Sequence, residues 1–238
     1  MAGVSRLQYT PEIKIVRLMC TGRVDPAIVA GAFKKGLDGL LVVGCYFGDC
    51  HYITGNHQAK AKMDFTRKLL KHIGVNEDRL AFRQCSSGEA SVFVGLINEF
   101  DEKIRELGPL GGQGDRLNAP EIFKKLETAQ AVLAGEKIRW VIGKRTPFLE
   151  TGNIYGEIFT EHEFNRAIDM IIVEEIEVQE ILGKLKEGAQ SVKELAKALA
   201  IPTERVFRYI TALKRKDMVA LEKISGRTPI FQLVPQEV

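Results

Sequence analysis

The sequence predicts an α/β fold in its first half and a small winged helix-turn-helix at its end. In the first half, short apolar runs alternate three times with helical segments, which is the pattern of an open parallel sheet of the flavodoxin-like or Rossmann-like kind. In the last third, the order is helix, helix, turn, helix and hairpin, which is typical of a winged helix.

The first predicted strand covers residues 13–19 and ends at Cys20. A helix is expected over 26–35, because Asp25 is a good N-cap and proline suits the first helical position. Gly36 ends this helix. The first strand and helix therefore make one unit of the alternating pattern.

The second predicted strand, residues 39–44, is wholly apolar and leads into a glycine-containing turn with Cys45 and Cys50. A continuous apolar run of this length is typical of a strand buried on both faces. The elements that complete this half are a helix over about 58–72, a strand over 80–84 that leads to Cys85, and a helix over 89–106.

The beginning of this predicted sheet is incomplete. Residues 3–9 show no periodicity and lead directly into the strand at 13–19. Three parallel strands are few for a sheet that helices cover on both faces. We therefore expect a further strand and helix upstream, either supplied by a partner chain or lost in defining this sequence.

The rest of the chain divides at changes of composition. Residues 109–118 are rich in glycine and polar side chains, so we expect an α/β domain over 1–109, a connector over 110–160 and a winged-helix domain over 161–238. The connector is predicted to contain a helix over 119–134, a strand-like run over 137–143 and a loop over 146–158. Thr160 and Glu163 form a capping-box pattern for a helix that begins there.

The winged-helix domain is predicted from helices over 176–186, 191–200 and 202–216 and strands over 219–224 and 230–234. Its third helix and the tip of its hairpin carry basic side chains that suit contact with phosphate groups. The candidate nucleic-acid-binding residues are Arg205, Arg208, Tyr209, Lys214, Arg215 and Arg227.

Composition limits the function classes. The chain has 238 residues and a formal net charge of +3, which is too small to indicate nucleic-acid or membrane binding by itself. No run approaches a membrane span, and the first residues show no basic segment followed by an apolar signal core, so we expect a cytoplasmic protein with no membrane partner. Its four cysteines are then expected to be reduced thiols, metal ligands or redox groups rather than structural disulfides.

The four cysteines follow the three predicted strands, so Cys20, Cys45, Cys50 and Cys85 should meet at the carboxyl edge of the sheet, where open α/β sheets place their sites. A single cysteine at a strand end is most often a small core residue. A tetrahedral zinc site usually takes two close pairs, and only Cys45 and Cys50 form one. An iron–sulfur cluster tolerates ligands from separate loops, and its known spacings include C-x4-C.

Polar side chains beside Cys50 are candidates to surround these ligands. We expect Asp49 and His51 to hydrogen-bond the site, and His51 and His57 could also bind the metal directly. Histidines in loops are, however, most often simply solvated.

Several stretches resemble one known family. They are residues 19–26, 38–45 and 48–52 and the pair Gly55–Asn56. Over about residues 3–109 the chain closely resembles the iron–sulfur delta subunit of methyl-viologen-reducing hydrogenase, the MvhD/FlpD family. The resemblance implies a [2Fe-2S] cluster with Cys20, Cys45 and Cys50 as ligands, and Cys85 stands where members of the family vary.

The resemblance also implies a function. Members of the family look like single-electron relays that pass electrons from a hydrogenase or formate dehydrogenase to the flavin-containing A-type component of heterodisulfide reductase. This role is a non-catalytic one, and no nucleophile triad, phosphate-binding loop or catalytic carboxylate pair stands out in the sequence. The winged helix leaves an alternative, a redox-sensing DNA-binding transcriptional regulator, although winged helices also dock proteins.

One departure from the family pattern agrees with the incomplete sheet. Such proteins usually begin with a strand and a Cys-x-x-Cys turn, and this sequence starts after that point. We expect either that a neighbouring polypeptide supplies those cysteines or that the true start lies upstream, for example beyond a selenocysteine codon read as a stop. Without them, Cys20, Cys45, Cys50 and Cys85 could still form a four-thiolate site.

Overall fold

A computed structural model describes residues 6–235 of the chain, and its contacts divide the chain into two compact units. Unit 1 is Met1–Asp169 and unit 2 is Met170–Val238. Residues 3–5, at the start of the family-like region, lie outside the described residues. No described helix combines the length and the apolar composition that a bilayer crossing requires.

Unit 1 contains a parallel sheet of two strands, β1 (Leu40–Gly44) and β2 (Leu80–Gln84). Their register pairs Leu40 with Leu80 and Gly44 with Gln84. The crossover between them is α2 (Gly55–His72) followed by a 3-10 turn, η2 (Glu77–Arg79). The strand–helix–strand order confirms the predicted α/β class for this unit.

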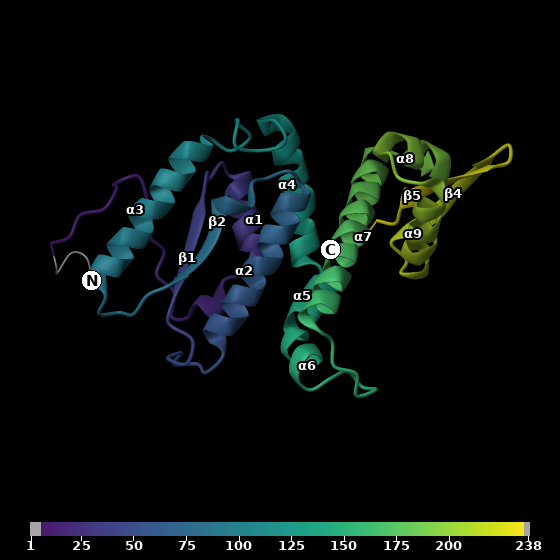
Figure 1. Cartoon of the computed structure of the whole chain (residues 1–238). Coiled ribbons are helices and arrows are strands. Elements are labelled where there is room, and N and C mark those ends of the chain that lie inside the picture. Colours follow the sequence, from purple (N-terminus) through teal and green to yellow (C-terminus); the bar gives the residue numbers. More distant parts are fainter. Residues whose placement is uncertain (1–5, 236–238) are drawn as a thin grey trace. The chain divides into compact units, whose positions relative to one another are not determined.

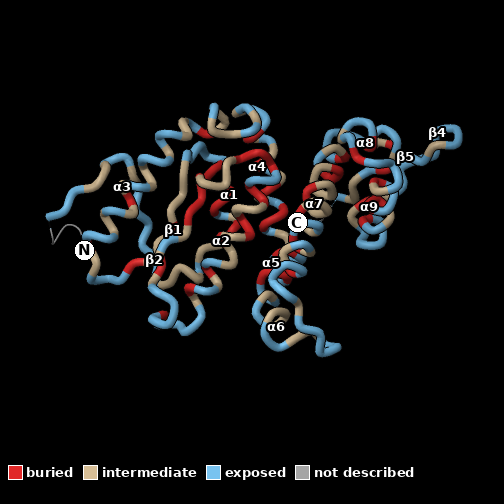
Figure 2. Tube along the Cα trace, viewed as in Figure 1, coloured by how far each residue is buried: buried red, intermediate tan, exposed pale blue. Residues whose placement is uncertain are grey.

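Helices cover both sides of this sheet. In Figure 1, α3 (Ala90–Leu107) lies on one side, and α1 (Pro26–Lys34) and α2 lie on the other. The Asp25 side chain accepts the Ala27 N–H at 2.9 Å, so it caps α1 as predicted. Figure 2 shows buried residues along α1, α2 and α4 (Ala119–Ala134), and α4 packs against α1. The core of unit 1 therefore lies mainly on the α1 and α2 side.

The strand predicted at 13–19 is wrong for the described structure. The segment forms no regular secondary structure, and among residues 6–235 no strand pairs with it. Its apolar side chains face solvent, with Val16 80% and Met19 79% exposed. Strand geometry persists only where a neighbour satisfies the backbone N–H and C=O groups. The apolar composition of residues 13–19 is therefore not sufficient for a strand, because the described structure contains no strand that pairs with them.

The strand-like run at 137–143 is also wrong, because it forms the helix α5 (Glu136–Gly143). Ile138, Val141 and Ile142 are buried, whereas Trp140 is 55% exposed. This spacing of three and four residues places the apolar side chains on one helical face rather than alternating across a strand. The loop expected after it contains a further short helix, α6 (Arg145–Glu150).

The glycine-rich segment after α3 is fixed to unit 1 by a buried ion pair. Arg79 and Asp115 side chains are both fully buried and lie 2.8 Å apart. Arg79 also donates to the carbonyl groups of residues 38 and 107–109, and Asp115 accepts the N–H groups of Asn76 and Gly111. Because the pair is bonded to backbone groups on all sides, the segment is an ordered loop and not a free tether.

Unit 2 begins within α7 (Glu161–Glu187), a single helix that is capped by Thr160 and Glu163 as predicted and that includes the helix expected at 176–186. After it come β3 (Gln190–Ser191), α8 (Val192–Leu199), α9 (Thr203–Arg215), β4 (Val219–Ser225) and β5 (Thr228–Leu233). The strands form an antiparallel sheet in the order β3-β5-β4. Its core contains Ile181, Leu195, Val206, Ile210 and Val219.

Candidate functional site

Cys45 and Cys85 lie at the carboxyl edge of the parallel sheet, as predicted. Cys45 follows β1 and Cys85 follows β2, and the strand register places the two residues next to each other. The Cys85 N–H donates to the Gly44 carbonyl at 2.9 Å, which extends the ladder by one bond. Both backbones are therefore fixed by strand pairing.

Cys20 and Cys50 converge on the first residue of α2, Gly55. A Cβ atom on Gly55 would overlap Cys20 Sγ and would lie 3.3 Å from Cys50 Sγ. Cys20 itself caps the 3-10 turn η1 (Thr21–Arg23), and its sulfur accepts the Gly22 N–H at 3.4 Å. The bare Cα of Gly55 therefore allows two sulfurs to approach the N-terminus of a helix.

Cys45 and Cys50 interact through their thiols, and their surroundings shift their pKa values in opposite directions. Burial raises the pKa of Cys45, and the Cys50 thiol raises it further. Burial would also raise the pKa of Cys50, but backbone N–H groups of Asn56, Tyr52 and Gly55 and the Cys45 thiol lower it overall. Cys50 is therefore the thiol of this pair that more readily becomes a thiolate.

Asn56 is a functional candidate that the sequence did not identify as such. Its side chain is fully buried in the second position of α2. Its Nδ2 donates to the carbonyls of Tyr46 at 2.6 Å and Cys45 at 3.2 Å, and lies 3.7 Å from Cys45 Sγ. The sequence signal was its place in the Gly55–Asn56 pair, but only the fold shows what its amide contacts.

Cys85 makes separate contacts on its side of the edge. Its sulfur donates to the carbonyls of Ser86 at 3.3 Å and Glu89 at 3.4 Å. Burial, and then the Glu89 carboxylate, raises the pKa of Cys85. That carboxylate also accepts the Tyr46 hydroxyl at 3.0 Å. The described contacts join Cys20, Cys45 and Cys50 to one another, and join Cys85 to the start of α3.

Within residues 6–235, no group of three or more cysteine, histidine, aspartate or glutamate side chains is placed to hold one metal ion. The predicted polar neighbours Asp49 and His51 are exposed. The His51 ring lies edge-on to Tyr52 with ring centroids 5.1 Å apart, and the His57 ring stacks on Phe47 at 4.3 Å. These two imidazole rings therefore pack against aromatic rings at the rim of the site.

In unit 2, the candidate nucleic-acid-binding residues separate into two groups. Tyr209 is 4% exposed, and its hydroxyl donates to Glu177 at 2.9 Å. Arg205 forms an ion pair with the same Glu177 at 2.6 Å. These two side chains therefore already bind Glu177 within unit 2. The remaining candidates are exposed: Arg208, Lys214, Arg215 and Arg227.

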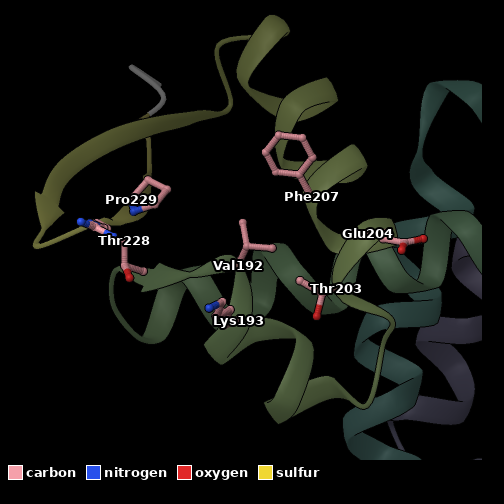
Figure 3. Close-up of a pocket in the computed structure, with 8 residues that line it drawn as sticks. Val192, Lys193, Thr203, Glu204, Phe207, Thr228 and Pro229 are labelled. Carbon is pink, nitrogen blue, oxygen red and sulfur yellow. The ribbon is translucent and has the colours of Figure 1, made fainter.

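A shallow pocket of about 370 Å³ lies between α8, the start of α9 and the β4–β5 hairpin. Figure 3 shows Val192 between Phe207 on one side and Thr228 and Pro229 on the other. Phe207 is 59% exposed. Charged residues of both signs also line the pocket, so it is not a simple anion-binding surface: Lys193, Glu204 and Arg227.

Fold and site together define an α/β protein whose thiols gather at the carboxyl edge of a parallel sheet, beside a helix N-terminus. Among known protein families, residues 1–108 match the delta subunit of methyl-viologen-reducing hydrogenase, FlpD. The iron-sulfur D subunit of the F420-non-reducing hydrogenase of Archaeoglobus profundus is 41% identical over 109 residues, which are 46% of this chain and 80% of that protein. Its counterpart from the vhu hydrogenase of Methanocaldococcus jannaschii is also 41% identical over 109 residues, 46% of this chain and 81% of that protein.

This chain therefore belongs to the methyl-viologen-reducing hydrogenase delta subunit family. Similarity also extends to a much larger protein. The A subunit of the ferredoxin/F(420)H(2)-dependent CoB-CoM heterodisulfide reductase of Methanosarcina acetivorans is 42% identical over 113 residues, which are 48% of this chain. The matched region is 14% of the length of that relative.

Proposed function

We propose that this chain is a non-catalytic electron-transfer subunit that holds an iron–sulfur cluster. Its donor is a hydrogenase or formate dehydrogenase, and its acceptor is the flavin subunit of a heterodisulfide reductase-type complex. The observation that carries the proposal is the convergence of Cys20, Cys45 and Cys50 at the start of α2, in a chain of the delta-subunit family. Relatives named as iron-sulfur subunits of a hydrogenase support the proposed electron donor, and a relative named as part of a heterodisulfide reductase supports the proposed acceptor.

The residues present fit a [2Fe-2S] cluster held by Cys20, Cys45, Cys50 and Cys85. The donor set is entirely thiolate, and in such a cluster the four ligands are shared between two irons, so no three of them need to meet at one ion. Cys85 is the fourth ligand because the strand register places it beside Cys45. When bound, the cluster supplies a one-electron redox centre.

The protein's own groups prepare this site for negative charge. Backbone N–H groups at the start of α2 lower the pKa of Cys50, and the Gly22 N–H donates to Cys20 Sγ. Thiolate ligands and a reduced cluster both carry negative charge, which N–H donors and a helix N-terminus stabilise. The side chains of Asp49 and His51 surround these ligands and do not bind the iron.

The rim of the site suits protein partners. Several side chains next to the three converging cysteines are apolar or aromatic and partly exposed, among them Phe47 at 42%, Tyr52 at 52% and Ile53 at 82%. Exposed aromatic side chains with few charges are typical of the centre of protein interfaces. Both redox partners are therefore proteins that approach this edge, and we place the complex in the cytoplasm.

We propose that the chain consists of a flavodoxin-like domain over 1–109, a connector over 110–160 and a winged-helix domain over 161–238. The order of α7, α8, α9 and the β4–β5 hairpin supports the winged helix. The regulator alternative lacks such support, because Tyr209 and Arg205 contact Glu177. Full-length protein should give no sequence-specific, salt-dependent anisotropy change with labelled duplex DNA.

The experiment that tests the cluster is iron and acid-labile sulfide analysis, with EPR of the dithionite-reduced chain after anaerobic reconstitution. We expect two irons and a [2Fe-2S] signal per chain, and loss of both in the Cys20→Ser, Cys45→Ser and Cys50→Ser variants. Cys85→Ser tests the fourth ligand separately. A full signal in Cys45→Ser would overturn the ligand assignment, and a wild-type chain without iron would overturn the proposal for this chain.

A further inference from the structure

We infer that Asn56 is a positioning residue for the thiol site: its amide fixes the Cys45 loop and donates a hydrogen bond to the Cys45 sulfur, which sets the reduction potential of the cluster. This inference rests on the proposed function. It is drawn from one fully buried side chain that contacts the loop after β1 from the first turn of α2.

The amide group of Asn56 has two hydrogens and three acceptors. The Tyr46 carbonyl, at 2.6 Å, takes one hydrogen, and the other is shared between the Cys45 carbonyl at 3.2 Å and Cys45 Sγ at 3.7 Å. Gln84 Nε2 also donates to the Cys45 carbonyl, at 3.1 Å. Because Gln84 also donates to that carbonyl, the sulfur is the acceptor of this group for which Asn56 is the side-chain amide donor.

The same residue lies next to the other end of the loop. It follows Gly55, and a Cβ on Gly55 would lie 3.3 Å from Cys50 Sγ. Its Oδ1 accepts the His57 N–H at 2.9 Å, which fixes the side-chain rotamer and the direction of the amide hydrogens. The Asn56 amide therefore contacts Cys45 from a position next to the helix residue that Cys50 approaches, and the amide is itself rigid.

A hydrogen bond to a ligand sulfur acts on the redox equilibrium. Reduction adds negative charge to the cluster and its thiolates, so an N–H donor stabilises the reduced form more than the oxidised form. Removal of the donor should therefore lower the reduction potential. One hydrogen bond of ordinary strength corresponds to about a tenfold change in equilibrium, which is about 59 mV for one electron.

The test compares Asn56→Ala and Asn56→Ser with a matched control, Thr66→Val. Thr66 is also a fully buried polar residue of α2, but its hydroxyl donates to the Lys62 carbonyl, away from the thiols. In EPR-monitored redox titrations of the reconstituted chain, the reduction potential of both Asn56 variants should be lower than that of wild type by about 59 mV. Thr66→Val should keep the wild-type potential. Equal potentials and equal EPR spectra in all four proteins would overturn the inference.

A second readout needs no cluster. In the metal-free chain, alkylation of each cysteine by iodoacetamide is followed by mass spectrometry, with Cys85 as the internal reference because its sulfur contacts only Ser86 and Glu89 among the described hydrogen bonds. Asn56→Ala should lower the Cys45 rate relative to Cys85, by up to about tenfold, because the lost N–H donor no longer stabilises the reactive thiolate. An unchanged ratio would overturn the inference. If wild type holds no iron, the proposed function fails, and this ratio still decides the role of Asn56.

Discussion

At the scale of single residues, the site depends on the absence of one side chain. Gly55 is the first residue of α2, and two sulfurs from separate segments approach its Cα. Any Cβ atom at this position would occupy the space of Cys20 Sγ. Residue 55 must therefore be glycine for a steric reason that comes from the thiol site. Helix propensity gives no such reason, because glycine is a poor helix former.

We therefore expect Gly55→Ala to lose iron binding while the chain stays folded. The displaced Cys20 sulfur can no longer join Cys50 at the start of α2. Iron content after reconstitution and far-UV circular dichroism measure the two parts of this prediction. Gly95→Ala is the matched control, because a Cβ there meets no atom within 4 Å and should add up to about 1 kcal/mol of helix stability. Full iron content in Gly55→Ala would contradict the steric argument.

At the scale of elements, the loop after α3 is held by burial of charge rather than by its own sequence preferences. Its glycines allow tight turns, and Gly111 has a φ of +81°. What fixes the loop is the Arg79–Asp115 pair, whose remaining donors and acceptors bind backbone groups around it. A buried pair of this kind is costly to break, because one partner is left as an isolated charge.

We expect Asp115→Asn to destabilise unit 1 by about 3–5 kcal/mol, because it leaves the Arg79 guanidinium buried and uncompensated. Urea unfolding followed by circular dichroism measures this loss. Glu99→Gln is the control, since its ion pair with Arg83 is 3.9 Å long and solvent-exposed, and should change stability by less than about 1 kcal/mol. Equal losses in the two variants would show that the buried pair has no special role.

At the scale of the whole molecule, the chain consists of two units with separate cores. The cysteines all belong to unit 1, and the buried cluster around Ile181, Leu195 and Val206 belongs to unit 2. Unit 2 has its own capping box, in which Ser191 and Glu194 bond each other's backbone N–H groups. Its folding therefore does not require the thiol site.

We accordingly expect Cys45→Ser to leave unit 2 unchanged. In amide NMR spectra of the full chain, resonances of Met170–Val238 should keep their wild-type positions, whereas those of residues near β1 and the start of α2 should move. Cys85→Ser serves as a second perturbation of unit 1 from the neighbouring strand. Shifts that extend across the core of unit 2 would show that the two units are coupled.

The sequence by itself determined most of the helices, both strands of the parallel sheet and the location of Cys45, Cys50 and Cys85 beyond strand ends. These features follow from local rules: caps such as Asp25, glycine stops, and the period of apolar side chains. It failed at 13–19 and 137–143, because a strand needs a pairing partner and a helical face needs a core, and neither is visible in a short run.

Only the tertiary structure decided how the site is assembled. The sequence indicated four thiols at one edge, but the packing brought Cys20 against Gly55, directed the Asn56 amide to Cys45, and turned Cys85 to the start of α3. These contacts join segments far apart in the chain, and their geometry is set by the crossover from β1 through α2 to β2. A pattern of residue types can predict which groups meet at an edge, whereas hydrogen bonds and steric gaps follow from the three-dimensional path of the backbone.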